Sequence, residues 1–581
     1  MEHFEYIKRF LKIIFRLNKM KLLVSFLIMA IISSFELCLP QILKLILDNA
    51  ILNNNINLLI KLVVIYISVI TIVALLSIII EYLYSVMKKK VSIKLKISLL
   101  KHLTKLSGAY YSNIKTGNIL SIVENDIFIL ESFGAELLFS VISNFITAIV
   151  SLFFLANMQF DLLCIVVLLQ IFLIYFQSKV AKIITLKTNE IRNGYGDIYN
   201  IVQEFIYNIM NVVISKYSFQ FFKKYIKKEK DIISKCVSLD VIISSNIYIS
   251  RFLTNIMTIF IYGYGGIKII KGEMSIGNLI AFQQYTGMLI GPCINIIKSN
   301  TTLHQSLISL KRIFSILDEP ITIKTYYNGK LMDKHNNEDI VFKDVKFSYG
   351  KLKVLKGINI KFKKGNITAI VGPSGCGKST IVNLLFRLWD VDEGNIIIGN
   401  EDIKNYNLKS LRKNISVITQ ELLIIDDSIF NNLTLGNKRI SKSYLEDICK
   451  KVDIYSYIET LPNKFDTIIG ENGVKLSGGQ KQKIAIVRSL INDSNILIFD
   501  EATSALDNIS QRNILKNIKE YLYNKTVIVI AHRLSSIKDA DEIYVINDGI
   551  VVEKGLHNEL LMNKNLYYNL TNEQVEESIK V

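Results

Sequence analysis

The first half of the chain contains six long apolar stretches, and these limit its fold more than any other feature. A helix needs about 20 apolar residues to cross about 30 Å of hydrocarbon. Stretches of this length lie at roughly 22–47, 58–83, 137–158, 162–180, 242–270 and 276–297. After Pro320 the sequence instead alternates short strands and helices. We therefore expect an all-α transmembrane domain of six spans, followed by a soluble α/β domain.

The connections between these stretches differ in length and charge. The loop at 48–56 contains no Lys or Arg, whereas the long connections at 84–136 and 181–241 are rich in Lys. Because Lys and Arg accumulate on the cytoplasmic side, both long connections are predicted to be cytoplasmic. Folded as two antiparallel helices of about 25 residues, each would extend about 37 Å beyond the membrane. Before the first span, apolar residues at helical spacing, among them Phe10 and Ile14, predict an amphipathic helix at the cytoplasmic interface.

Charge and cysteine content exclude several classes of protein. The net charge is +18, but the cations are scattered through the connections, so membrane topology accounts for them and no nucleic-acid partner is expected. The 6 cysteines show neither metal-ligand nor paired spacing, which argues against a zinc site and structural disulfides. The composition, rich in Ile, Lys and Asn, suggests an AT-rich bacterial genome. We expect a multi-pass protein of the bacterial cytoplasmic (inner) membrane, with both termini in the cytoplasm.

A phosphate-binding loop opens the clearest functional argument. The segment Gly372-Pro-Ser-Gly-Cys-Gly-Lys378-Ser379 fits the pattern G-x-x-x-x-G-K-[ST] between an apolar strand and a helix. Glycines allow backbone N–H groups to approach phosphates, the lysine contacts the β- and γ-phosphates, and the serine hydroxyl coordinates Mg²⁺. The residues expected to contact the nucleotide here are Gly372, Ser374, Gly375, Cys376, Gly377, Lys378, Ser379 and Thr380. The loop predicts a nucleotide-binding protein.

Two later motifs resemble those of the ATP-binding cassette (ABC) family. They are Leu476-Ser-Gly-Gly-Gln480, similar to the family signature, and Ile496-Leu-Ile-Phe-Asp500-Glu501, similar to its Walker B strand. The segments 111–126 and 272–320 look like the coupling region and the sixth span of exporter-type members. The resemblance covers nearly the whole chain. It implies a transmembrane domain at 1–320, a linker at 321–338 and a nucleotide-binding domain at 339–581.

The resemblance also implies roles for residues around the reacting phosphate. Asp500, at the end of a buried strand, is the expected metal-side carboxylate, and Glu501 would orient or deprotonate the attacking water. Gln420 would contact Mg²⁺ or water, and His532 would lie near the γ-phosphate. Tyr349 resembles the aromatic residue that stacks on adenine. ATP and Mg²⁺ are thus the implied cofactors.

The signature implies that two chains share each ATP. Ser477, Gly478, Gly479 and Gln480 stand at a helix start, which suits a γ-phosphate bound to the opposing cassette, and Asp507 resembles the loop that crosses the dimer interface. Lysines stand at 481 and 483, where the family commonly has arginines. The positive charge is kept but the planar guanidinium is lost, so we expect the contacts of this helix end to differ from those usual in the family.

These features favour ATP-driven export of an amphipathic or hydrophobic substrate, such as a drug, lipid or peptide, by alternating access of a dimer. Because every catalytic position is intact in one half-length chain, we expect a homodimer, with a heterodimer as the alternative. Polar residues within apolar runs are candidates for lining a cavity; they are Glu36, Lys44, Gln170, Gln177 and Arg251. Two other functions remain open, an importer built on the exporter fold and an immunity or regulatory ABC protein that moves no substrate.

Overall fold

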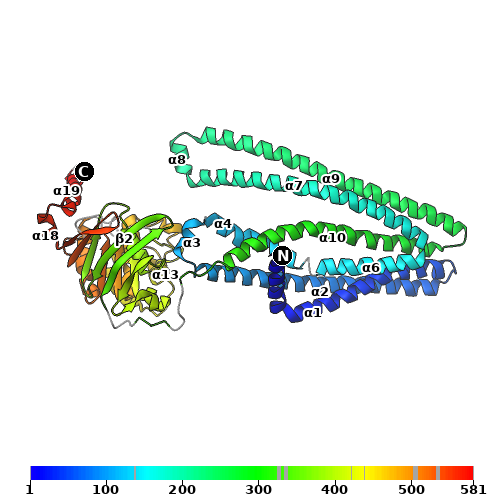
Figure 1. The fold of residues 1–581 in the computed structure, drawn as a ribbon. Coiled ribbons are helices and arrows are strands. Elements are labelled where there is room, and N and C mark those ends of the chain that lie inside the picture. The colour runs from blue at the N-terminus through cyan, green and yellow to red at the C-terminus, as the bar shows by residue number, and fades with distance from the viewer. Residues whose placement is uncertain are drawn as a thin grey trace. The chain divides into compact units, whose positions relative to one another are not determined.

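The computed structural model of the chain describes residues 2–114, 116–135, 139–323, 329–332, 338–419, 422–437, 439–500, 508–530 and 537–579. The chain divides into two compact units (Figure 1). The first comprises 1–104 and 115–319, and the second comprises 105–114 and 320–581. The segment 105–114 thus belongs to the second unit, although the sequence places it between the second and third expected spans.

The first unit is built of long helices. The longest, α9 (Ser218–Ile270), has 53 residues, so it is about 80 Å long at 1.5 Å per residue and far exceeds the hydrocarbon thickness. Figure 1 shows α7 and α9 lying side by side, joined at one end by the short α8. The helices of this unit are α1 (Glu2–Leu45), α2 (Ile56–Leu103), α4 (Thr116–Ser121), α5 (Ile127–Ala135), α6 (Val141–Met158), α7 (Phe160–Tyr207), α8 (Ile209–Ile214), α9 and α10 (Ile276–Leu317), with π-helical turns at Ile46–Ile51 and Ile122–Asp126.

Five helices in the described part of the chain are long and apolar enough to cross a membrane. They are Phe4–Ile51, Ile56–Leu103, Val141–Met158, Phe160–Tyr207 and Ser218–Ile270. The sixth expected span, 276–297, lies in the first half of α10, which is one continuous helix but is not among these five. That span stays a prediction.

Two short connections between the apolar helices are joined by one carboxylate. Asp48 follows α1, and its side chain accepts hydrogen bonds from the Ser275 hydroxyl at 2.5 Å and from the Gly277 backbone N–H at 2.9 Å. Ser275 also caps α10 by accepting from the Asn278 backbone N–H at 3.1 Å. The loop after α1 therefore lies beside the turn between α9 and α10.

The core of the first unit is centred on a tyrosine in α10. Tyr285 is fully buried, and its ring stacks on Phe154 of α6 with ring centroids 4.9 Å apart. Its hydroxyl donates to the Leu37 carbonyl of α1 at 2.7 Å and accepts from the Gln41 amide at 3.2 Å. Because a buried hydroxyl without a partner would destabilise the fold, these bonds fix where α1, α6 and α10 meet.

The second unit contains two sheets. The smaller has the strand order β2-β1-β4-β5 and the larger β10-β9-β3-β8-β7-β6. In the larger sheet β9, β3, β8, β7 and β6 run parallel, and β10 is antiparallel. The strands are β1 (Ile340–Tyr349), β2 (Leu352–Phe362), β3 (Ile367–Val371), β4 (Glu393–Ile398), β5 (Glu401–Asp402), β6 (Ile415–Ile418), β7 (Ile496–Asp500), β8 (Thr526–Ile530), β9 (Glu542–Asn547) and β10 (Ile550–Gly555).

Helices accompany the parallel sheet. Its strands read as continuous apolar runs because both faces are covered, and four of the five residues of β7 are buried. The apolar strand expected before the phosphate-binding loop is β3, and the buried strand expected to end at Asp500 is β7. The helices are α3 (Gly108–Asn113), α11 (Lys378–Leu385), α12 (Leu408–Lys413), α13 (Ile429–Thr434), α14 (Lys442–Lys451), α15 (Tyr455–Thr460), α16 (Gly478–Ile491), α17 (Asn508–Leu522), α18 (His557–Met562) and α19 (Leu566–Ile579).

Candidate functional site

The phosphate-binding loop joins β3 to α11. Gly375 and Gly377 have φ values of 82° and 106°, a region that residues with a Cβ rarely adopt. At Gly372, an added Cβ would overlap the Ile546 carbonyl oxygen of β9. The loop therefore needs glycine for two separate reasons, backbone conformation at 375 and 377 and close approach to the next strand at 372.

Lys378 occupies the centre of this loop. It is only 6% exposed, and its ammonium donates to the Gly372 and Pro373 carbonyls at 2.8 and 2.9 Å. Ser379, next in the chain, is exposed, as are Ser374 and Gly375, whereas Cys376 and Thr380 are buried. The loop thus presents the Ser379 hydroxyl to solvent at the start of α11 and keeps the lysine buried. A phosphate bound here would meet both a helix N-terminus and a cation.

The carboxyl ends of β3, β7 and β8 meet at one edge of the larger sheet. Asp500 ends β7 and is paired in register with Ile530, the last residue of β8. Since β8 lies between β7 and β3, Asp500 and the start of the phosphate-binding loop are two strand spacings apart, about 10 Å. Parallel α/β sheets bind ligands at this edge. The structure therefore brings together the loop and the carboxylate that the sequence assigned to the metal.

Four predicted site residues lie outside the described residues. Gln420 follows β6, Glu501 follows Asp500, His532 follows β8, and Asp507 precedes α17 in the sequence. Their roles stay predictions.

The signature forms the start of α16. The Ser477 hydroxyl accepts from the Gln480 backbone N–H at 3.3 Å, and the Gln480 side chain accepts from the Ser477 N–H at 2.8 Å. This capping box fixes the first turn, and the buried Leu476 anchors it. Ser477 and Gly478 are exposed, so the positive end of the α16 dipole faces outward. The geometry suits an anion supplied by another molecule.

Lys483, one of the two unusual lysines in α16, pairs with a residue that follows another helix. Lys483 donates to the Asp453 carbonyl at 2.7 Å and pairs with its carboxylate at 2.8 Å. Asp453 lies just after α14, so this lysine joins two helices of the second unit. A single ammonium satisfies both acceptors, and the planar fork of an arginine is not needed for this contact.

Tyr349 ends β1 beside the phosphate-loop helix. Its hydroxyl accepts from the Asn383 amide of α11 at 3.2 Å, and its ring meets the edge of Trp389 at a centroid distance of 5.2 Å and an angle of 85°. The ring is half-buried. These contacts hold an aromatic ring next to α11, and its contact with adenine stays a prediction.

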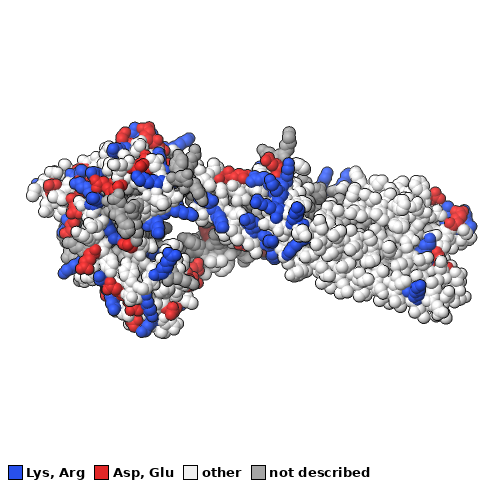
Figure 2. Space-filling model, turned by 90° about the horizontal axis from the view of Figure 1, so that it is seen from below, with Lys and Arg blue, Asp and Glu red and all other residues white. Residues whose placement is uncertain are grey.

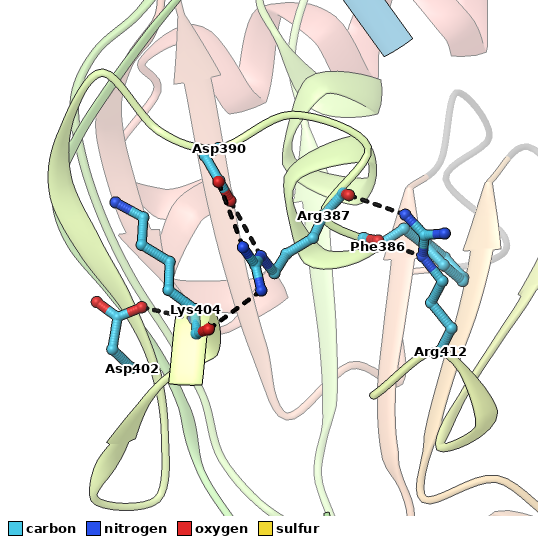
Figure 3. A network of polar contacts seen from close by, with 6 residues as sticks. All are labelled: Phe386, Arg387, Asp390, Asp402, Lys404 and Arg412. Carbon is cyan, nitrogen blue, oxygen red and sulfur yellow. Dashed lines mark hydrogen bonds and ion pairs between the residues drawn. The ribbon is translucent and has the colours of Figure 1, made fainter. Parts of the chain in front are cut away.

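The turn after α11 is held by two arginines that the sequence analysis did not single out (Figure 3). Arg387 is 2% exposed and has a φ of 46°; its guanidinium donates to both Asp390 carboxylate oxygens, at 3.0 and 3.3 Å, and to the Lys404 carbonyl at 3.2 Å. Arg412 of α12 donates to the Phe386 and Arg387 carbonyls, both at 2.9 Å. Burial, together with the neighbouring Arg387, lowers the pKa of Arg412. These bonds fix the turn that carries Trp389.

This turn contacts the segment 105–114 within the second unit. The Gly108 backbone N–H donates to the Leu388 carbonyl at 2.8 Å, and a Cβ at Gly108 would overlap the ring of Trp389. Gly108 begins α3, so the contact starts three residues before the coupling region that the sequence analysis assigned from residue 111. The local sequence around Gly108, a glycine followed closely by Tyr110 and Tyr111, gives little indication of this contact.

Replacing Gly108 by Val is expected to release α3 from the turn at Leu388. The added side chain would overlap Trp389, and overpacking of this kind costs about 1–3 kcal/mol, or about a 5- to 150-fold weaker contact. Tryptic cleavage after the exposed Lys105 measures the release, and it should become at least several-fold faster. Gly117→Val is the matched control, because no atom lies within 4 Å of a Cβ there. Equal cleavage rates in the two variants would contradict the contact.

Alkylation of Cys376 is expected to block ATP binding. Its sulfur lies 3.9 Å from the Lys378 ammonium and faces Gly372, so an added group would displace the loop. Cys449, also in the second unit, is fully buried, and burial raises its thiol pKa to about 12, so it should react more slowly. ATPase activity during treatment with N-ethylmaleimide is the measurement, with Cys376→Ala as the resistant control. Full activity after complete modification of Cys376 would contradict this expectation.

The polar residues expected in the membrane occupy different environments. Gln177 of α7 donates to the Ser250 hydroxyl of α9 at 3.1 Å, so it serves to pair these helices. Gln170 is 4% exposed, and its amide atoms have no hydrogen-bond partner among the described residues. Glu36 and Lys44 are half-buried, and Arg251 is exposed. Gln170 and Glu36 are therefore the stronger candidates for contact with a substrate or a second chain.

Comparison with known proteins agrees with both units. The family model for the ABC transporter transmembrane region matches residues 22–293, and the ABC transporter model matches residues 355–504. An ATP-dependent lipid A-core flippase of Desulfotalea psychrophila is 33% identical over 504 residues, covering 85% of this chain and 87% of the flippase. A protein of the same name from Syntrophus aciditrophicus is 30% identical over 498 residues, covering 85% and 82%.

A solved structure shares the fold. It is a bacterial Atm1-family ABC exporter with ATP bound, 25% identical, and it superposes with a TM-score of 0.84 over 96% of this chain and 99% of the exporter. A single chain thus joins a multi-pass helical domain to a phosphate-binding cassette, and both its sequence and its fold match exporters over most of their length. The chain belongs to the ABC transporter family.

Proposed function

We propose that the chain is half of an ATP-driven exporter that forms a homodimer and moves an amphipathic lipid across the bacterial cytoplasmic membrane. One observation carries the proposal. The second unit presents a phosphate-binding loop at the start of α11 and a separate, exposed helix start at Ser477, and the same chain carries long apolar helices. Relatives named lipid A-core flippases support a lipid-type substrate.

Different site residues would bind the phosphates and position the attacking water. Lys378 and the loop N–H groups would hold the β- and γ-phosphates, and Ser477 of a second copy would contact the γ-phosphate from the other side. Phosphoryl transfer depends mostly on such positioning and on stabilising charge. Glu501 would orient the attacking water, with His532 near the γ-phosphate. ATP would close the dimer because its phosphates contact both copies only when the copies meet.

The residues present fit a magnesium ion. Mg²⁺ prefers oxygen ligands, and the exposed Ser379 hydroxyl and the Asp500 carboxylate belong to the same edge of the sheet. Ser379, Asp500 and Gln420 would hold the ion, which would neutralise charge on the phosphates when bound. The Ser379 hydroxyl and the Asp500 carboxylate would supply oxygen ligands to the ion.

Transport into inverted membrane vesicles tests the proposal. A panel of fluorescent lipids, peptides and dyes is offered with ATP, and vesicles containing Glu501→Gln serve as the blank. ATP-dependent accumulation of a lipid in inverted vesicles, absent from the blank, is the expected result. Uptake into intact cells without such accumulation would indicate an importer. ATPase activity that no substrate changes, with no accumulation, would indicate a regulatory protein.

A further inference from the structure

The first part of α1 carries an exposed face of basic residues. Lys8, Lys12 and Arg16 follow one another at four-residue spacing, so they lie on one side of the helix. Lys19 continues the series beyond a kink at Asn18, whose φ is −134°. All four cations are exposed. Within the described part of the chain, none of them has an ion-pair or hydrogen-bond partner.

Packing fixes the direction of this face. Phe10 and Ile14 are 1% and 5% exposed and line an apolar groove with residues of α2 and α5, among them Met87 and Leu130. At 100° per residue, positions 10 and 14 point away from positions 8 and 12. Because the apolar side is buried against the helices of the first unit, the basic side must face outward.

Chain continuity places this face at a membrane surface. The first span is expected to begin at Leu22, six residues after Arg16, a rise of about 9 Å along a helix. Figure 1 shows that the first part of α1 runs across the direction of the long helices. Figure 2 shows Lys and Arg gathered in a patch beside a long stretch of surface almost without charged residues. The exposed Phe4 and Phe15, 74% and 48% exposed, belong to the same helix. Basic helices with exposed aromatic residues suit an anionic lipid surface.

The same helix is joined to the end of α10. Arg9 forms a bidentate ion pair with Asp318, with N···O distances of 2.6 and 2.7 Å. Its guanidinium lies 4.1 Å from the centroid of the Phe314 ring, on which Tyr6 also stacks. Asp318 directly follows α10, and the chain enters the second unit at Pro320. The N-terminal helix is therefore joined to the residues that lead into the cassette.

We propose that the face formed by Lys8, Lys12, Arg16 and Lys19 binds anionic phospholipid headgroups of the cytoplasmic leaflet, and that the Arg9–Asp318 pair conveys this binding to the ATPase. Headgroup phosphates complement the four exposed cations, and the exposed phenylalanines reach the acyl region. Bound lipid holds the N-terminal helix in place, and through Arg9 it holds the end of α10. The proposal concerns regulation by lipid and does not depend on which substrate is moved.

Spin-labelled phosphatidylglycerol and phosphatidylcholine test the binding step. The full chain is reconstituted in phosphatidylcholine vesicles, with or without phosphatidylglycerol, and the fraction of each labelled lipid that the protein immobilises is measured. Wild type should prefer phosphatidylglycerol, and replacing the four cations by Gln should lower that preference at least about tenfold. The matched control replaces four exposed cations of the second unit by Gln, with the same change in net charge. These are Lys363, Lys409, Lys413 and Lys516.

Thermal unfolding in detergent checks that both quadruple variants fold. An unchanged lipid preference in the first variant, or an equal loss in both, would overturn the binding proposal. Stimulation of ATPase activity by phosphatidylglycerol tests the second step. In Arg9→Gln and in Asp318→Asn, lipid preference should stay close to wild type while the stimulation is lost. Full stimulation in both variants would overturn the role of the ion pair.

Discussion

Replacing Glu501 by Gln is expected to lower ATP turnover by about 10²- to 10⁴-fold, the usual contribution of a general base. The change removes the carboxylate that would orient or deprotonate the attacking water, but it leaves the phosphate-binding loop and Asp500 intact. ATP binding should therefore persist. Phosphate release measures turnover, and a fluorescent ATP analogue measures binding.

Glu520→Gln is the matched control for this substitution. Glu520 has a side chain that is 87% exposed and lies in the same cassette, so the control loses the same charge away from the sheet edge. Its turnover should stay close to wild type. Normal hydrolysis by Glu501→Gln would remove the assignment of the base and would leave the family assignment untouched.

Lys378→Ala is expected to weaken ATP binding by about 10- to 150-fold, which corresponds to the loss of one charged hydrogen bond worth about 1.5–3 kcal/mol. The side chain is buried within the loop, where its ammonium is held by two backbone carbonyls. Lys378→Arg should restore binding only in part, because the larger planar group does not fit between the Gly372 and Pro373 carbonyls.

The exposed Lys413 provides the control for charge. Lys413→Ala should bind ATP like wild type, and thermal unfolding should show that Lys378→Ala keeps its fold. If Lys378→Ala folds and binds ATP with wild-type affinity, the loop does not act as the phosphate site. That result would also remove the main support for the proposed ATP-driven export.

Local sequence patterns predicted the elements of the cassette well. The strand before the phosphate-binding loop, the strand ending at Asp500 and the helix after Ser477 are confirmed because each depends on residues close together in the chain. An apolar run bounded by turn residues specifies a buried strand. A Ser followed three residues later by a Gln specifies a helix start.

Contacts between distant residues could not be predicted in the same way. The arginines at 387 and 412 meet at one turn only because α12 folds back beside α11. Gly108 and Trp389 are farther apart still in the sequence. No local pattern around either residue indicates a contact with the other. The long connection at 84–136 also differs from the predicted pair of antiparallel helices. Its first part belongs to α2, a helix of 48 residues, and several short helices follow. An apolar pattern predicts the length of a helix poorly when that helix continues beyond the membrane.

The chemistry of the site was predicted in part from residue types and in part from family resemblance. The phosphate-binding loop follows from glycines, a lysine and a serine at fixed spacing, and its geometry agrees with that role. The roles of Gln420, Asp507 and His532 depend on resemblance alone and stay predictions. No single-chain sequence pattern specifies the substrate, because the helices that would surround it are selected mainly for apolarity.

The turn at Trp389 has one further consequence for experiments. The chain contains 1 tryptophan, and its ring lies between Tyr349 and the backbone of Gly108. Ultraviolet emission at wavelengths where only indole is excited therefore originates from this single position. The unlabelled wild-type protein thus carries a spectroscopic probe placed where an adenine ring and the segment 105–114 would both alter its surroundings.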